Sequence, residues 1–311
     1  MLSKGRGIIF FGTPKFAVPT LQALIESGEN ILLVITQPDK PKGRGKAVQP
    51  TEIKQFALEK GLTVIQPDKI KEETLIKKLK DLNPEFAVVV AYGKILPKEL
   101  LDIPSRGCIN LHASLLPKYR GAAPIQWALI RGEKTTGVTT MLIDEGLDTG
   151  PILMQREINI DKEDNALTLS EKLSQMGAKL VIETLNNLRK GLIAPTPQQG
   201  QSSYAPQLKK EDGRIDWQKR AEEIFNLIRG TYPWPCAYCF LKNERIKIIK
   251  AEVLPGNAIP GLIVKAKNEL IVGTAEGLLK IIQLQPEGKK VMNAKEFIAG
   301  RKINEGMDSF S

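Results

Sequence analysis

Short apolar runs alternate with helical patterns over residues 7–91, and this alternation constrains the fold more than any other feature of the sequence. The run GIIFFG at 7–12 is typical of a strand, and the next residues, 13–28, carry apolar side chains at helical spacing. Further strands are predicted at 31–36, 62–65 and 86–91, with helices at 51–59 and 71–82. Strands separated by such helices predict a doubly wound parallel sheet, the Rossmann-like α/β fold.

The turn after the first predicted strand argues against a nucleotide cofactor. It is GTPKF rather than G-x-G-x-x-G, so Pro14 and Lys15 occupy places where a pyrophosphate would need bare backbone. A Rossmann-like sheet does not by itself imply a bound nucleotide. We therefore expect no NAD.

The composition changes near residue 191, and the change predicts two domains. A chain of 311 residues is long for one core. Residues 191–210 are rich in Pro, Gln, Gly and Ser without periodicity, which predicts a linker between a catalytic domain at 1–190 and a second domain at 211–311. The second domain begins with a predicted helix at 215–229. Short alternating strands from 237 to 285 follow it, which favours a small OB-like β-barrel.

The chain has a single histidine, His112, and two polar residues are placed to join it. Asn110 lies two positions earlier on a predicted strand, so both side chains face the same side. Asp148 lies in the turn EGLDTG after a strand predicted at 136–143. An amide and an imidazolium can donate hydrogen bonds to a developing oxyanion, while a carboxylate favours the charged ring and accepts a proton.

This set of side chains predicts acyl transfer in which a substrate supplies the nucleophile. Ser114 follows His112 closely, but no G-x-S-x-G elbow surrounds it. The alternative is structural, because a lone histidine on a strand is often a packed core residue and Asp148 could simply form a turn.

A basic segment at 37–50, QPDKPKGRGKAVQP, follows the second predicted strand. Its prolines and glycines argue against a helix or an interior strand, so we expect a long exposed loop. The net charge of the chain is +10, which favours polyanionic partners. The candidate phosphate contacts in this loop are Lys40, Lys42, Arg44 and Lys46. The alternative is a solvated surface loop.

The three cysteines and the apolar runs bear on location. The cysteines are too few for a disulfide framework, which favours a reducing compartment. Cys236 and Cys239 form a CxxC, but zinc needs further ligands and the only histidine is in the other predicted domain, so we expect no metal. No apolar run approaches the roughly 18 residues of a membrane span, and no signal-peptide core is present. We expect a cytoplasmic protein, and nothing demands more than a monomer.

Several motifs together resemble the 10-formyltetrahydrofolate-dependent formyltransferases, over about Ile8 to Ala299. The motifs are FGTPKFA, TQPDKPKGRGK, VVAYGKILP, NLHASLLPKYRGAAPIQWAL, GLDTGPI and YPWP. They are most similar to the branch of the family that acts on methionyl-tRNA. The resemblance implies formyl transfer from 10-formyltetrahydrofolate to the α-amino group of methionine on initiator methionyl-tRNA. The tail at 300–311 matches nothing in that pattern.

The resemblance also implies roles for individual residues. Asn110 and His112 would stabilise a tetrahedral intermediate, and Asp148 would keep His112 charged and handle the amine proton. The residues expected at the folate are Val90, Tyr92, Gly93, Ile95, Ser114, Leu115, Leu116, Pro117 and Leu147. The basic loop would contact the tRNA acceptor end, and the barrel would hold the tRNA body. The alternatives are another folate-dependent formyltransferase, a formyltetrahydrofolate hydrolase, or a non-catalytic RNA-binding protein.

Overall fold

The structure is a computed structural model that describes residues 7–42 and 47–311. The chain forms two compact units. Unit 1 runs up to Pro124 and includes Thr135–Ile158 and Ser170–Ala205. Unit 2 contains Ile125–Lys134, Asn159–Leu169 and Pro206–Ser311.

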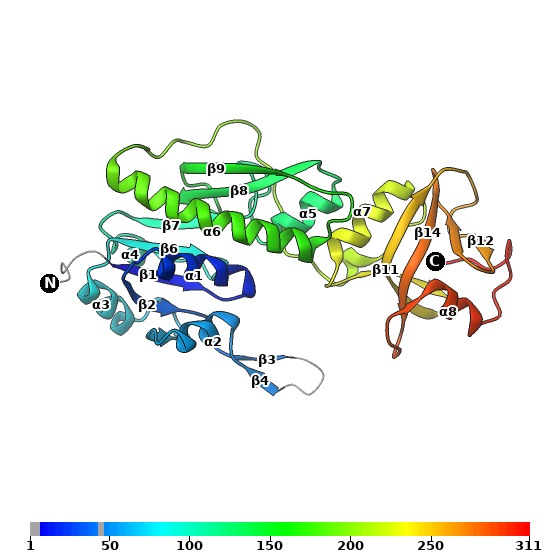
Figure 1. The fold of residues 1–311 in the computed structure, drawn as a ribbon, viewed down its shortest axis with the longest axis horizontal. Coiled ribbons are helices and arrows are strands. Elements are labelled where there is room, and N and C mark those ends of the chain that lie inside the picture. The colour runs from blue at the N-terminus through cyan, green and yellow to red at the C-terminus, as the bar shows by residue number, and fades with distance from the viewer. Residues whose placement is uncertain (1–6, 43–46) are drawn as a thin grey trace. The chain divides into compact units, whose positions relative to one another are not determined.

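Unit 1 is built on a seven-stranded sheet, and Figure 1 shows its order from β2 to β9. The order is β5 (Val64–Ile65), β2 (Ile31–Ile35), β1 (Ile8–Gly12), β6 (Phe86–Val90), β7 (Cys108–His112), β8 (Thr135–Leu142) and β9 (Ile152–Asn159). The first five strands are parallel, and β8 runs antiparallel to β7. The predicted Rossmann-like fold is confirmed, and an antiparallel edge is added to it.

Burial explains why β1 and β6 are continuous apolar runs. Every residue of both strands is buried, because helices cover the faces of a parallel sheet. The helical segments that lie wholly within unit 1 are η1 (Lys15–Ala17), α1 (Val18–Glu26), α2 (Glu52–Glu59), α3 (Glu73–Leu82) and α4 (Lys98–Leu101). The long helix α6 (Ala166–Lys190) ends where Arg189 forms ion pairs with Glu29 and Glu85.

The strand order reverses between β1 and β6. From β1 the chain moves outward to β2 and β5, and it then returns to β6 on the other side of β1. Open α/β sheets bind ligands at this reversal, outside the carboxyl ends of the strands. Val90 ends β6 and His112 ends β7, so the predicted site residues lie at this edge.

The basic segment, which we predicted to be a long exposed loop with no helix or interior strand, forms a short two-stranded hairpin where it is described. Strands β3 (Lys40–Lys42) and β4 (Ala47–Gln49) pair antiparallel as a separate two-stranded sheet (Figure 1). Pro41 is tolerated because a strand with only one partner can turn its missing N–H side outward. Arg44 and Lys46 lie outside the described residues, and only the backbone of Lys42 is described.

The base of this hairpin is fixed by polar contacts. Asp39 accepts hydrogen bonds from Lys54 Nζ and from Gln66 Nε2, the latter at 2.6 Å. The bond from Lys54, followed by that from Gln66, holds the pKa of the Asp39 carboxyl below its usual range.

Unit 2 is an antiparallel barrel with short helices, as predicted. Its strands are β10 (Ala237–Leu241), β11 (Glu244–Leu254), β14 (Leu278–Pro286), β13 (Leu270–Gly273) and β12 (Ile263–Ala266) in spatial order, with β15 (Met292–Asn293) paired to β14. Its helical segments are α5 (Pro124–Ile130), η2 (Glu211–Gly213), α7 (Ala221–Thr231) and α8 (Ala294–Ala299).

The helix predicted at 215–229 begins later than expected. Asp216 accepts a hydrogen bond from the Gln218 backbone and forms a turn. The Glu223 carboxylate then accepts from the Arg220 backbone N–H at 3.2 Å, which satisfies one free donor at the helix start, and α7 begins at Ala221. Ile215 and Trp217 are buried in the barrel core, so their apolar spacing did not signal a helix.

The C-terminal tail closes the barrel. Ile263 N donates to Asp308 O at 2.9 Å, and Phe310 N donates to Gly261 O at 2.8 Å. Ser311 and Phe240 exchange backbone bonds of 2.9 and 2.8 Å. The tail therefore bonds to β10 and beside β12, the two ends of the sheet, and removes its open edges.

Candidate active site

The imidazole of His112 lies between two acceptors at the carboxyl end of β7. Its Nδ1 is 3.6 Å from Asp148 Oδ2, and its Nε2 is 2.9 Å from the Tyr119 carbonyl oxygen. A carbonyl only accepts, so Nε2 carries a proton. The Nδ1 to carboxylate distance exceeds the usual 2.7–3.2 Å of an N–H···O bond, so Nδ1 is not committed to this partner.

Asp148 is held in an unusual backbone conformation in the turn between β8 and β9. Its φ is +52°, in the left-handed region that costs a non-glycine residue about 1–2 kcal/mol. Gly121 N donates to Asp148 Oδ2 at 2.8 Å, which aims the carboxylate toward His112. The conformation is thus fixed by contacts from other segments.

Asn110 occupies the same face of β7 as His112, as the spacing of two predicts. Its side chain is half-buried and makes no hydrogen bond to any described residue. The sheet edge therefore presents an uncommitted amide beside the His112–Asp148 pair, which suits a group that must receive hydrogen bonds.

The SLLP segment, Ser114 to Pro117, forms a braced turn next to the site. The Ser114 hydroxyl donates to Lys118 O at 2.6 Å, and Leu116 N donates to Thr139 Oγ1 at 3.2 Å. Ser114 and Leu116 are buried, whereas Leu115 and Pro117 are half-buried and lie nearer the surface.

The segment after β6 contributes backbone rather than side chains. Val90 and Tyr92 are buried, and the Tyr92 hydroxyl has no hydrogen-bond partner among the described residues. Burial raises the pKa of Tyr92 to about 12. The Tyr92 carbonyl accepts from Thr13 Oγ1 and Gln37 Nε2, at 3.0 and 2.8 Å. Gly93 follows with φ +82°, where a Cβ would lie 2.6 Å from Gln37 Nε2.

Two large aliphatic side chains stand exposed on the predicted folate-binding segments. Ile95 is 80% exposed and Leu147 is 55% exposed. Of the predicted folate residues, these two are therefore the most available for apolar contact.

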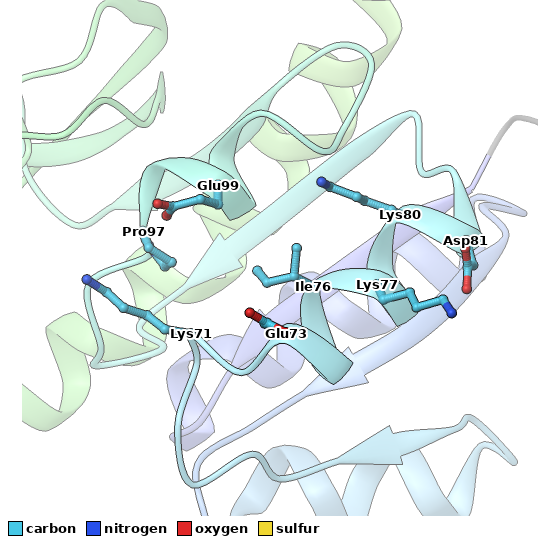
Figure 2. Close-up of a pocket in the computed structure, with 8 residues that line it drawn as sticks. All are labelled: Lys71, Glu73, Ile76, Lys77, Lys80, Asp81, Pro97 and Glu99. Carbon is cyan, nitrogen blue, oxygen red and sulfur yellow. The ribbon is translucent and has the colours of Figure 1, made fainter.

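A pocket elsewhere in unit 1 is a weaker candidate for a ligand site than the edge that carries His112. Figure 2 shows the side chains around it, which come from α3, from α4 and from residues just before each of these helices. Its lining is Lys71, Glu73, Ile76, Lys77, Lys80, Asp81, Pro97 and Glu99. The charges balance, and none of the predicted site residues is among them, so the pocket indicates no ligand class.

The cysteines do not form a reactive or metal-binding centre where the chain is described. All three are buried and free, and burial raises the pKa of the Cys108 thiol to about 12. No group of three or more His, Cys, Asp or Glu residues within the described ranges could hold a metal ion.

Sequence reasoning missed two contributors to the site. The Tyr119 carbonyl holds His112, and the Gln198 side chain bonds to the Asp148 turn. Tyr119 contacts His112 through its backbone carbonyl, and the type of a side chain does not predict a backbone contact. Gln198 lies in the predicted linker, 50 residues from Asp148.

Comparison with known proteins identifies the family of the chain. The family described as formyl transferase matches residues 6–185, and the formyl transferase C-terminal domain matches residues 207–302. The chain belongs to the formyl transferase family. The predicted family resemblance is confirmed, and the two matched ranges fall largely in unit 1 and unit 2.

Relatives in the formyl transferase family match nearly the whole chain. The methionyl-tRNA formyltransferase of Thermodesulfovibrio yellowstonii is 74% identical, covering 98% of this chain and 99% of its own. That of Caldanaerobacter subterraneus subsp. tengcongensis is 51% identical, covering 96% and 98%. The solved sugar 3N-formyl transferase WlaRD, with dTDP and 5-N-formyl-THF, matches with a TM-score of 0.68 at 21% identity. It covers 93% of this chain and 100% of its own, and it supports the fold.

Proposed function

We propose that the chain transfers a formyl group from 10-formyltetrahydrofolate to the α-amino group of methionine on initiator methionyl-tRNA. One observation carries the proposal: His112 Nδ1 lies 3.6 Å from Asp148 Oδ2, and His112 shares one face of β7 with Asn110. The high identity of relatives named methionyl-tRNA formyltransferase supports the choice of acceptor.

Asn110 and His112 stabilise charge on the formyl oxygen. When the amine nitrogen bonds to the formyl carbon, the carbonyl electron pair moves to that oxygen. In this proposal the Asn110 amide and His112 Nδ1 both donate hydrogen bonds to that oxygen, and each such donor contributes about 10²–10³ in rate. Because the Tyr119 carbonyl holds Nε2, the ring presents Nδ1 in a fixed direction.

Asp148 handles the proton that the amine loses. Its Oδ2 lies 3.6 Å from His112 Nδ1, and a carboxylate at this place can accept a proton. As the intermediate collapses, the bond from the formyl carbon to the folate N10 breaks. The amine proton passes to that nitrogen by way of the carboxylate, so the protein ends unchanged.

The substrate contacts follow the same assignment. The folate lies against Ile95 and Leu147, with the backbone of the Tyr92–Gly93 segment and the SLLP turn beside it. The tRNA acceptor end contacts Lys40, Lys42, Arg44 and Lys46, while the barrel binds the tRNA body.

The division into a catalytic domain at 1–190, a linker at 191–210 and a tRNA-binding domain at 211–311 stays a prediction, as do the monomeric state and the cytoplasmic location. No helix in the described part of the chain is long and apolar enough to cross a membrane.

The test is a competition among acceptors. The purified chain receives labelled 10-formyltetrahydrofolate with initiator methionyl-tRNA, free methionine or an aminosugar nucleotide. We expect label on methionyl-tRNA alone. Faster transfer to the sugar would favour another formyltransferase, and formate release without an acceptor would favour a hydrolase. No turnover together with tight tRNA binding would favour a non-catalytic RNA-binding protein.

The basic segment at 37–50 has a separate test. Arg44→Ala should raise the apparent KM for tRNA and lower the salt-dependence slope of tRNA binding by about 1, because one phosphate contact is lost. The control is Lys71→Ala, an exposed cation before α3. Equal salt slopes in wild type and Arg44→Ala would exclude the loop from tRNA binding.

A further inference from the structure

The segment Thr196–Ala205, which we call the strap, is hydrogen-bonded at both ends to other segments of unit 1. Thr196 and Ile152 exchange two backbone hydrogen bonds of 2.8 Å. Near the other end, Arg120 N donates to Ser203 O at 2.8 Å and Ala205 N donates to Arg120 O at 2.7 Å. The strap therefore runs from β9 to the segment that faces His112.

Gln198 of the strap uses its full hydrogen-bonding capacity on the surroundings of Asp148. Its Nε2 donates to the carbonyls of Asp148 and Gly150, both at 2.8 Å. Its Oε1 accepts from Arg120 Nε at 3.1 Å and from Arg120 Nη2 at 2.7 Å. Arg120 directly precedes Gly121, whose N–H holds the Asp148 carboxylate. Gln198 thus fixes the turn that carries Asp148 and the segment that aims it.

Ser203 of the strap acts on the other member of the pair. Its Oγ accepts from Tyr119 N at 2.9 Å, and the Tyr119 carbonyl accepts from His112 Nε2. Tyr119 has φ +60°, a left-handed conformation like that of Asp148. Such residues keep this conformation only where their surroundings hold it.

We propose that the strap positions the His112–Asp148 pair, with Gln198 acting on Asp148 and Ser203 acting on His112 through Tyr119. Both are positioning residues, and the inference rests on the proposed formyl transfer. The neighbours Gln199 and Ser202 have the same side chains but are exposed and make no side-chain hydrogen bond to the described residues. The strap thus contains its own matched controls.

The experiment compares the full chain carrying Gln198→Met or Ser203→Ala with Gln199→Met and Ser202→Ala. A misplacement of about 1 Å at a reacting group can cost about a hundredfold in rate. We expect kcat to fall about ten- to a hundredfold in the first two variants, with KM for tRNA within about twofold. The controls should match wild type in both constants. Wild-type kcat in Gln198→Met and Ser203→Ala would overturn the proposal.

A third variant separates the bonds to Asp148 from general packing. Gln198→Glu keeps the volume and the acceptor for Arg120 but loses both donors to the Asp148 turn. We expect it to lose kcat as Gln198→Met does. Wild-type kcat in Gln198→Glu would show that Gln198 does not act through Asp148.

A readout that needs no turnover distinguishes failure of the strap from failure of the function. The chain has one histidine, so a sample with 15N-labelled histidine gives one set of ring-nitrogen signals, those of His112. We expect Gln198→Met and Ser203→Ala to shift these signals, and the controls to superimpose on wild type. Unshifted signals in both variants would overturn the strap. If the wild-type chain does not formylate methionyl-tRNA, the proposed function fails while these signals still decide the role of the strap.

Discussion

The strap at Thr196–Ala205 and the tail at 300–311 lack a periodic pattern, yet they support different parts of the molecule. The strap is largely exposed and bonds through polar groups around His112 and Asp148. The tail buries Phe310 to 3% exposure and bonds to both ends of the barrel sheet. The tail contributes a buried apolar side chain to unit 2, whereas the strap contributes hydrogen bonds that orient the surroundings of His112 and Asp148.

This difference predicts separate consequences of mutation. Burial of an apolar side chain contributes stability in proportion to its area, and hydrogen bonds to water-accessible groups contribute about 0.5–1.5 kcal/mol each. Changes in the tail should therefore alter the unfolding of unit 2. Changes in the strap should alter kcat with little effect on unfolding.

The largest effect is expected from Phe310→Ala. Phe310 stacks on Trp217 with ring centroids 5.8 Å apart, and loss of a buried phenylalanine costs about 3–5 kcal/mol. The three tryptophans, Trp127, Trp217 and Trp234, all belong to unit 2, so tryptophan fluorescence in denaturant follows this unit alone. The control is Met307→Ala, at a tail residue that is 81% exposed. Equal unfolding midpoints for both variants would show that the tail does not close the barrel.

Gly121→Ala probes the strap from the other side. Gly121 has φ +112°, and a Cβ there would lie 2.8 Å from the Ala205 carbonyl oxygen. The strap must move, so kcat should fall about tenfold or more while the fluorescence midpoint of unit 2 stays at its wild-type value. Gly200→Ala is the matched control, because it has φ +90° within the strap but nothing within 4 Å. A similar loss of kcat in Gly200→Ala would mean that backbone strain rather than strap placement lowers activity.

The smallest effect is expected from Asp308→Asn, and it depends on pH. The Asn304 backbone N–H and Lys242 both donate to Asp308, and these bonds lower the pKa of its carboxyl. A lowered folded-state pKa contributes stability above the ordinary value of about 3.9, and that contribution is lost as the pH falls through the folded-state pKa. The variant should therefore unfold earlier than wild type at pH 7, and the two curves should converge in acid. A difference that stays constant from pH 7 into acid would exclude this ionisation.

The sequence predicted the site residues that a short motif identifies, because such a motif needs no knowledge of distant segments. Asn110 and His112 share a strand face because they are two positions apart, and the EGLDTG turn placed Asp148 at a strand end. Gln198 and Ser203 could not be found in this way, because their bonds join residues 50 and 84 positions apart. The start of α7 was misplaced because the predicted helix was extended over the apolar residues Ile215 and Trp217, which serve the barrel core instead. The tail was missed because its pairing depends on edges formed by β10 and by the start of β12 with the residues before it.

Formyl transfer by His112→Ala is the most direct test of the site. Labelled formyl transfer to methionyl-tRNA should fall by about 10²–10³ or more, because one oxyanion donor is removed. Binding of methionyl-tRNA, measured in parallel, should stay within about twofold of wild type. Unchanged transfer by His112→Ala would contradict the assignment of this site.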